Sequence, residues 1–254
     1  MRRGSLVLAL VLAHTLSAAT QFKYVTESTG DRLIPRRAGT IRVDGVSYRV
    51  EPENDLMATA SFSTDGGKTV TALNEKLSTY YRPKDSSEML SSSFFSGMIP
   101  DPKVTVKDVS MTEELTDERI AGFAAKKYVL QFAHDVRLTL GGYPVRVFFH
   151  ATVLLWTTEE IDLAVVPMDL REIRTGLGEV DRKVREALAG VKGFPLKRRM
   201  SVTRRYEGGV VMVDAATTTF GDFKTAELSP RELAVPAGYR YEEPVILAPG
   251  VVSH

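Results

Sequence analysis

The sequence contains no cysteine and only one tryptophan, and it has four histidines in 254 residues. Without cysteine there are no disulfides, no thiolate metal sites, no cysteine nucleophile and no lipidated N-terminal cysteine. The net charge of +1 gives no overall attraction to nucleic acid or to anionic membranes. With 43% hydrophobic and 26% charged residues, the composition is typical of a globular protein that can bury a core.

Long hydrophobic runs are also missing, except near the N-terminus. Two arginines begin the chain, an apolar run follows at 6–13, and small side chains stand at Ser17 and Ala19. These features predict a signal peptide at 1–19 that is cut after Ala19, with a membrane anchor as the weaker alternative. The run is too short to span a hydrocarbon core of ~30 Å, and no later segment is long enough. We therefore expect a periplasmic or secreted protein with no transmembrane segment in the mature chain.

The rest of the chain shows no repeat of 20–50 residues and no low-complexity linker. We expect one domain over residues 20–246 and a disordered tail over 247–254, where little pattern remains. Removal of the two N-terminal arginines changes the formal net charge from +1 to −1. Binding of nucleic acid is not expected of such a chain.

The segment GTIRVDGVSYRVEP, residues 39–52, alternates apolar and polar side chains on both sides of Asp44-Gly45. An Asp-Gly pair favours a two-residue type I′ turn, so the segment predicts a β-hairpin. The expected pairs are Val43–Val46 and Ile41–Tyr48 on one face, and Arg42–Ser47 and Thr40–Arg49 on the other. One face of this hairpin is apolar and the other is charged.

A longer hairpin is predicted around Gly141-Gly142, with strands over 124–140 and 143–158. The expected pairs are Leu138–Val145, Val136–Val147, His134–Phe149, Phe132–Ala151, Leu130–Val153 and Tyr128–Leu155. All members of this face are apolar except one histidine. Strands of about 15 residues exceed the usual length of about 5–6 and suit a strongly curved sheet.

Further turns and two helices complete the expected elements. A turn at 64–69 joins strands at 57–63 and 68–73, and a third long hairpin turns at Gly208-Gly209. A helix over 179–192 is predicted from the stripe Val180, Val184, Leu188 and Val191, and a looser helix is expected at 84–97. Turn signals at this spacing indicate an antiparallel meander.

The residues offer little catalytic chemistry. There is no Gly-x-Ser-x-Gly elbow and no His-Glu-x-x-His motif. The predicted register places His134 and His150 on opposite faces of one hairpin, so they cannot share a metal ion. His134 is interpreted as a core histidine with one hydrogen bond rather than a ligand or base. We expect a protein that is not an enzyme and that uses no cofactor and no metal.

Two other features remain open. Five basic residues cluster on one predicted strand, namely Lys197, Arg198, Arg199, Arg204 and Arg205. A solvated rim is favoured over a nucleic-acid site, because the mature charge is near zero and only Tyr206 is interleaved as a stacking aromatic. An anionic lipid or surface polymer is an intermediate alternative. Trp156 is expected opposite Lys127, where packing under a loop is favoured over a place at a binding mouth.

Five segments in this order carry a resemblance to a known family: GTIRVDGVSYRVEP, GGKTVTALNEKLSTYY, IAGFAAKKYVLQF, KGFPLKRRMSV and LAVPAGYRYEEP. Over roughly residues 21–246 they resemble bacterial exported domains of unknown function related to the periplasmic lipoprotein-carrier fold. The resemblance implies an antiparallel sheet curled into an unclosed barrel with a helical element across its concave side. In the carriers proper this face shields lipid chains and passes them between partners.

We therefore predict a mostly β protein, an antiparallel meander curled into an unclosed half-barrel with one or two helices on the concave side. The predicted function is to hold a lipid or other hydrophobic ligand on the concave apolar face, and an envelope protein partner is possible. The alternative is an envelope structural or protein-interaction domain whose concavity is filled by its own helices. The expected ligand-binding residues are Tyr48, Tyr128, Leu130, Phe132, Phe149 and Val153.

Overall fold

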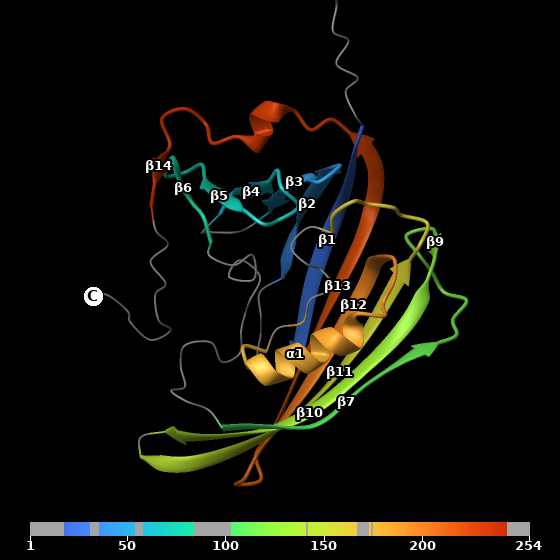
Figure 1. The fold of residues 1–254 in the computed structure, drawn as a ribbon, viewed down its shortest axis with the longest axis vertical. Coiled ribbons are helices and arrows are strands. Elements are labelled where there is room, and N and C mark those ends of the chain that lie inside the picture. Colours follow the sequence, from blue (N-terminus) through green and yellow to red (C-terminus); the bar gives the residue numbers. More distant parts are fainter. Residues whose placement is uncertain are drawn as a thin grey trace, which may run out of the picture.

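The structure is a computed structural model that describes residues 18–30, 36–53, 58–83, 103–140, 142–166, 173 and 175–242. The predicted signal peptide (but for its last two residues), the helix expected at 84–97 and the tail at 247–254 lie outside these residues. Within them, twelve strands form one open sheet in the order β14-β6-β5-β4-β3-β2-β1-β13-β12-β11-β10-β7. The sheet curls without closing into a barrel, as predicted (Figure 1).

The strands of the first part of the chain are β1 (Ala19–Gly30), β2 (Arg37–Asp44), β3 (Ser47–Pro52), β4 (Ala60–Ser63), β5 (Thr71–Asn74) and β6 (Thr79–Tyr81). Those of the second part are β7 (Lys103–Glu114), β8 (Arg119–Ile120), β9 (Phe123–Ala124), β10 (Lys126–Leu140), β11 (Tyr143–Thr158), β12 (Phe194–Tyr206), β13 (Val211–Ala226) and β14 (Arg240–Tyr241). The helical segments are α1 (Gly178–Leu188) and the short 3₁₀ helix η3 (Pro230–Leu233). Strands β8 and β9 form a separate small ribbon.

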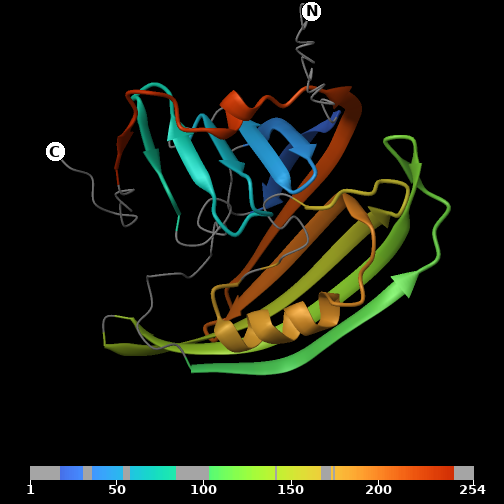
Figure 2. The ribbon, with the colours of Figure 1, turned by 45° about the horizontal axis from the view of Figure 1, so that its top comes forward.

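The sheet has two wings that meet at β1 and β13 (Figure 2). The long-strand wing consists of β7 and β10–β13, and α1 lies across its concave side. The short-strand wing consists of β2–β6, and the C-terminal segment with η3 and β14 runs over its outer side. Because β1 pairs with both β2 and β13, the N-terminal strand lies in the middle of the sheet rather than at an edge.

The long β10–β11 hairpin has the predicted register. Leu130 pairs with Val153 and His134 with Phe149, and the pairing continues without a slip from Lys126 to Leu140. A slip of one residue moves the whole apolar set to the other face. The register is therefore fixed by the side chains on one face of β10, namely Tyr128, Leu130, Phe132, Val136 and Leu138. The third hairpin, β12–β13, turns at Gly208-Gly209 as expected.

The β2–β3 hairpin forms, but the predicted pairing is wrong by two residues. The pairs are Val43–Tyr48, Ile41–Val50, Arg42–Arg49 and Thr40–Glu51. The two-residue loop is Gly45-Val46. Of the four turn residues 44–47, only Gly45 has a positive φ, 55°. A glycine alone at the first central position is the type II′ arrangement, whereas the expected type I′ turn needs positive φ at Asp44 as well. The apolar set stays on one face, but Val46 is exposed in the turn.

Helix α1 is shorter than the predicted 179–192 helix. It ends at Leu188, since Ala189 and Gly190 form a turn, and Val191 is buried beyond the helix. Glycine at 190 is a poor helix former, which accounts for the earlier end. No helix of the described residues is long and apolar enough to cross a membrane.

Candidate functional site

The two predicted hairpin faces lie on the same side of the sheet. Directly opposed residues of neighbouring antiparallel strands share a face. Thr218 of β13 pairs with Thr26 on one side and with Arg198 on the other, and Arg198 pairs with Leu155 of β11. From Thr26 the same face continues through Phe22 and its partner Ile41 into β2. The concave surface of the sheet is therefore continuous from one wing to the other.

The six expected ligand-binding residues are all buried, with at most 5% of each exposed. Leu130, Phe132, Phe149 and Val153 lie together in one apolar cluster of the long-strand wing. Tyr128 belongs to a neighbouring small cluster with Leu155 and Val191. Tyr48 packs in a separate cluster of the other wing. The structure thus brings four of the six together and leaves the two tyrosines outside that group.

The concave side of the short-strand wing is filled by aromatic rings. Phe22 contacts Phe194 edge-on at a centroid distance of 5.1 Å, and it stacks on Phe223 at 5.4 Å. Edge-to-face pairs of this kind add about 0.5–1.5 kcal/mol to simple burial. Tyr48 packs into the same cluster, and burial raises the pKa of its phenol to about 12, with the charge of Asp65 as a second cause. This phenol is neutral and structural.

Helix α1 covers the other apolar cluster. Its Val180 and Val184 are fully buried among the side chains of β10 and β11, and Leu177 joins them from the N-cap position. Asp181 accepts hydrogen bonds from the backbone and the hydroxyl of Thr175, at 2.6 and 2.7 Å. Thr175 and the helix therefore form one unit. The buried side chains of this cover are Ile173, Leu177, Val180 and Val184, and Ala187 and Leu188 pack beside them half-buried.

A histidine lies at the centre of the covered cluster. His134 is 4% exposed, and its ring stacks between Phe132 and Phe149 at centroid distances of 6.2 and 4.7 Å. Neither ring nitrogen has a hydrogen-bond partner among the described residues. Burial lowers its pKa to about 4, although the charges of Asp135 and Asp181 act in the opposite direction. The core position is as predicted, but the expected hydrogen bond is wrong. His150 is exposed, on the opposite face.

The basic cluster is divided by the alternation of β12. Arg198 and Arg204 lie on the concave face, where Arg204 forms a buried ion pair with Asp214. Lys197, Arg199 and Arg205 lie on the convex face. Trp156 is buried there, with the ammonium groups of Lys127 and Lys197 at 5.7 and 4.8 Å from its ring centroid. The Trp156 side chain is packed and buried, as the favoured interpretation predicted.

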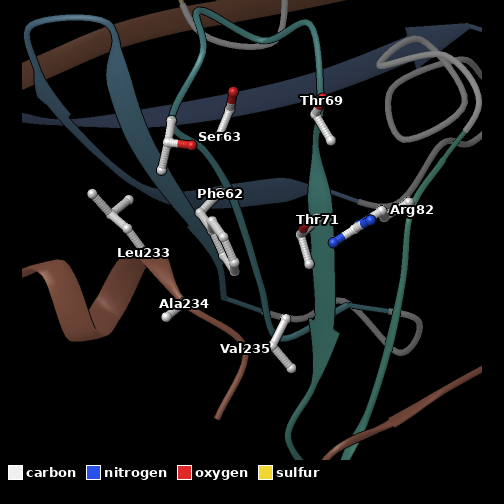
Figure 3. A pocket seen from close by; sticks show the side chains of 9 residues that line it. Phe62, Ser63, Thr69, Thr71, Arg82, Leu233, Ala234 and Val235 are labelled. Carbon is white, nitrogen blue, oxygen red and sulfur yellow. The ribbon is translucent and has the colours of Figure 1, made fainter.

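A hollow that the sequence did not predict lies on the outer side of the short-strand wing. It measures about 250 Å³ and is lined by Phe62, Ser63, Thr64, Thr69, Thr71, Arg82, Leu233, Ala234 and Val235 (Figure 3). The guanidinium of Arg82 points toward Thr71 across the hollow. It is open and shallow, and its lining comes from strands and a C-terminal segment about 150 residues apart in sequence. No local motif could have indicated it.

Within the described residues, no three His, Asp or Glu side chains lie close enough to hold a metal ion. The buried carboxylate next to His134 is ion-paired. Asp135 accepts a hydrogen bond from Arg146 at 2.7 Å and lies 3.5 Å from Lys107. Burial raises the pKa of Asp135, but these two cations outweigh it and the net shift is downward.

Comparisons with known proteins find solved structures of low similarity. No family model matches the sequence, and no curated protein matches it. A LolA superfamily protein from Nitrosomonas europaea is 11% identical, with a TM-score of 0.34, over 86% of this chain and 90% of that one. PNGF-II is 10% identical, with a TM-score of 0.39, over 89% of this chain and 31% of that one. The first bears the name of the carrier family that the sequence motifs resemble.

Proposed function

We propose that this protein is a non-enzymatic exported carrier that holds a long hydrophobic chain on the concave face of β10 and β11. The observation that carries the proposal is the contrast between this face and its cover. Among the described residues, β10 and β11 contribute eight buried side chains to the cluster, whereas the covering segment contributes four, namely Ile173, Leu177, Val180 and Val184. On this proposal the covering segment occupies the place that the ligand takes.

Magnitudes decide which ligand can displace this cover. Burial of one valine, leucine or isoleucine side chain contributes about 1.5–3 kcal/mol, so lifting the four side chains of the cover costs about 6–12 kcal/mol. An acyl chain gains about 0.8 kcal/mol per methylene, or about 8 kcal/mol for ten. Ten methylenes only balance the cover, before the entropy cost of binding. The ligand that fits this site is therefore a chain of roughly 14–18 carbons or a pair of chains.

The export part of the proposal is supported by the position of β1. Ala19 is buried and paired with Ala226, and Thr20 pairs with both Thr225 and Val43. Strand β1 thus begins at Ala19, the last residue of the predicted leader, so cleavage after it removes the Ala19–Ala226 pair and the sheet then begins at Thr20. We expect the mature N-terminus at Thr20, and intact-mass measurement of exported protein checks it. Retention of residues 1–19 contradicts it.

The carrier is tested by titration with fluorescent fatty acids of 8 and 16 carbons, in the absence of membranes. We expect binding of the longer probe and not of the shorter one. We expect Phe132→Asp and Leu130→Asp to abolish binding. Phe132→Ala, which we expect to weaken binding, replaces them in the test if the charged variants do not fold. Leu77→Asp, at an exposed position of the other wing, is the matched control and leaves binding unchanged.

The second candidate is the self-filled interaction domain, and the burial of all six predicted residues favours it. The variant Val184→Asp separates the two candidates, because it places a charge under α1. A carrier loses its cover and binds the 16-carbon probe more tightly, whereas a self-filled domain only loses stability. Arg182→Asp, on the exposed side of the same helix, is the control. If wild type and Val184→Asp bind no probe of either length, the self-filled domain is the function that remains.

A further inference from the structure

Two long hairpins end at the same end of the sheet, at the bottom of Figure 1. The β10–β11 hairpin turns next to Gly142, and the β12–β13 hairpin turns at Gly208-Gly209. The two are tied together, since Val147 pairs with Tyr206 and the amide of Glu207 donates a hydrogen bond to the Arg146 carbonyl at 3.1 Å. We call this end of the sheet the hairpin-tip surface. It consists of the two turns and the strand ends beside them, and it includes Tyr143 and Val213.

The hairpin-tip surface carries an unusual number of exposed apolar side chains. Tyr143 is 76% exposed, Val210 59%, Val211 49% and Val213 43%. Exposed apolar residues are ordinary when they are scattered, but these gather at the ends of neighbouring strands. By strand alternation Tyr143 shares the face of Val147, whereas Val211 and Val213 lie on the opposite face, so apolar side chains project from both faces at this end. Tyrosine is enriched where proteins meet the boundary between lipid headgroups and acyl chains.

Positive charge surrounds these residues. Arg137 of β10 and Lys103 of β7 are exposed and directly opposed. Arg205 is exposed between its cross-strand neighbours Phe148 and Val211. Like charges on neighbouring strands repel each other, so this arrangement favours an anionic surface that neutralises them.

The acidic groups of the same end do not cancel this charge. Glu207 is the exposed carboxylate at the β12–β13 turn. Asp135 is buried and ion-paired with Arg146 and Lys107, and Asp214 is buried and ion-paired with Arg204. Among the described residues of this end, three exposed cations therefore face one exposed carboxylate, although the whole chain is close to neutral.

We propose that the hairpin-tip surface docks on an anionic lipid bilayer. Tyr143 and the valines enter the headgroup region, and Arg137, Arg205 and Lys103 approach the lipid phosphates. The combination gives reversible attachment, because neither a handful of side chains nor a few charges anchors a protein permanently. The inference stands on the exposed residues and is independent of ligand carriage.

The absence of cysteine allows a clean test. A single cysteine replaces Val210 and carries an environment-sensitive fluorophore, and the control carries the same label in place of Leu77, which is 61% exposed on the other wing. We expect a blue shift at position 210, and co-sedimentation, with vesicles containing equal amounts of phosphatidylglycerol and phosphatidylcholine. Salt at about 0.5 M reverses both, because it screens the charges.

Charge reversal identifies the surface. Arg137→Glu with Arg205→Glu lowers vesicle affinity at least about tenfold. The matched control, Arg182→Glu with Arg240→Glu, reverses two exposed arginines elsewhere and changes it less than twofold. The proposal is overturned by no shift at position 210, by an equal shift at position 77, by an unaffected double variant, or by attachment that requires another protein in the vesicles.

Discussion

The two wings of the sheet are covered in different ways. On the long-strand wing, α1 rests on the concave face through Leu177, Val180 and Val184. On the short-strand wing, the C-terminal segment is fixed to the outer face by charges. Arg42 contacts the Glu232 carboxylate at 2.6 Å, and Arg49 donates a hydrogen bond to the carbonyl of Glu232 at 2.7 Å.

The difference teaches which cover can move. Charged hydrogen bonds between half-buried partners are directional, and breaking one leaves a desolvated group behind. Burial raises the pKa of Glu232, but the hydrogen bonds from Ser229 and Arg42 outweigh it and lower the pKa overall. Apolar contacts under α1 can instead be exchanged for those of another apolar group at little cost in specificity. Charged hydrogen bonds therefore fasten the C-terminal segment to the outer face. Helix α1 is held on the sheet by apolar contacts, and on the carrier proposal a ligand can replace it.

The largest expected effect breaks the outer cover. Arg49→Ala removes the donor to the Glu232 carbonyl, at 2.7 Å in the native protein. It also removes one of the two arginines that donate to Glu51, at 2.9 Å, and Arg42 remains as the other. We expect a loss of about 3 kcal/mol in the free energy of unfolding, measured by urea denaturation. Arg240→Ala removes an arginine that is largely exposed and costs under about 0.5 kcal/mol. Equal losses for both variants contradict the proposed fastening.

The next effect concerns His134 and acid. Its pKa is about 4 in the folded protein and 6.5 when unfolded, so between these values the unfolded chain binds a proton that the folded one does not. Stability therefore falls as pH drops from about 6.5 toward 4, by about 2 kcal/mol at pH 5. His134→Phe lacks this contribution. Unfolding curves at pH 7 and pH 5 check it, and an equal pH dependence in both proteins speaks against it.

A smaller effect loosens α1 alone. Val184→Ala removes two buried methyl groups, worth about 1.5 kcal/mol. If α1 opens separately from the sheet, its amides exchange with solvent about tenfold faster while those of β10 and β11 keep their rates. Hydrogen-exchange mass spectrometry measures both regions in one experiment. Uniform acceleration of helix and strands contradicts independent opening, and Arg182→Ala serves as the control.

The smallest effect lies on the convex face. Lys197→Met removes the cation 4.8 Å from the Trp156 ring centroid and keeps the length of the side chain. We expect the free energy of unfolding to fall by about 0.5–1 kcal/mol. The fluorescence of the only tryptophan in the sequence reports the unfolding transition. A variant as stable as wild type shows that Lys127 alone suffices.

Sequence reasoning succeeded where one pattern extended over many residues. The β10–β11 register follows from the apolar face of β10 and a glycine turn, and the structure has it. The β2–β3 pairing was wrong because Asp44-Gly45 and Gly45-Val46 both permit a two-residue turn, and only packing of Tyr48 opposite Val43 selects between them. The short strands β4–β6 owe their coverage to residues far away in sequence. No local pattern links Phe62 with Val235, so the outer hollow could not be predicted.

The central position of β1 has a consequence for how the chain is made. Thr20 pairs with Thr225, so the strand synthesised first lacks one neighbour until more than 200 further residues have followed. At usual rates of synthesis this takes roughly 10–40 s, and contacts so distant in sequence also form slowly. During this time the nascent chain cannot complete its sheet. The last long strand, β13, is therefore the one that closes the sheet, by pairing with β1.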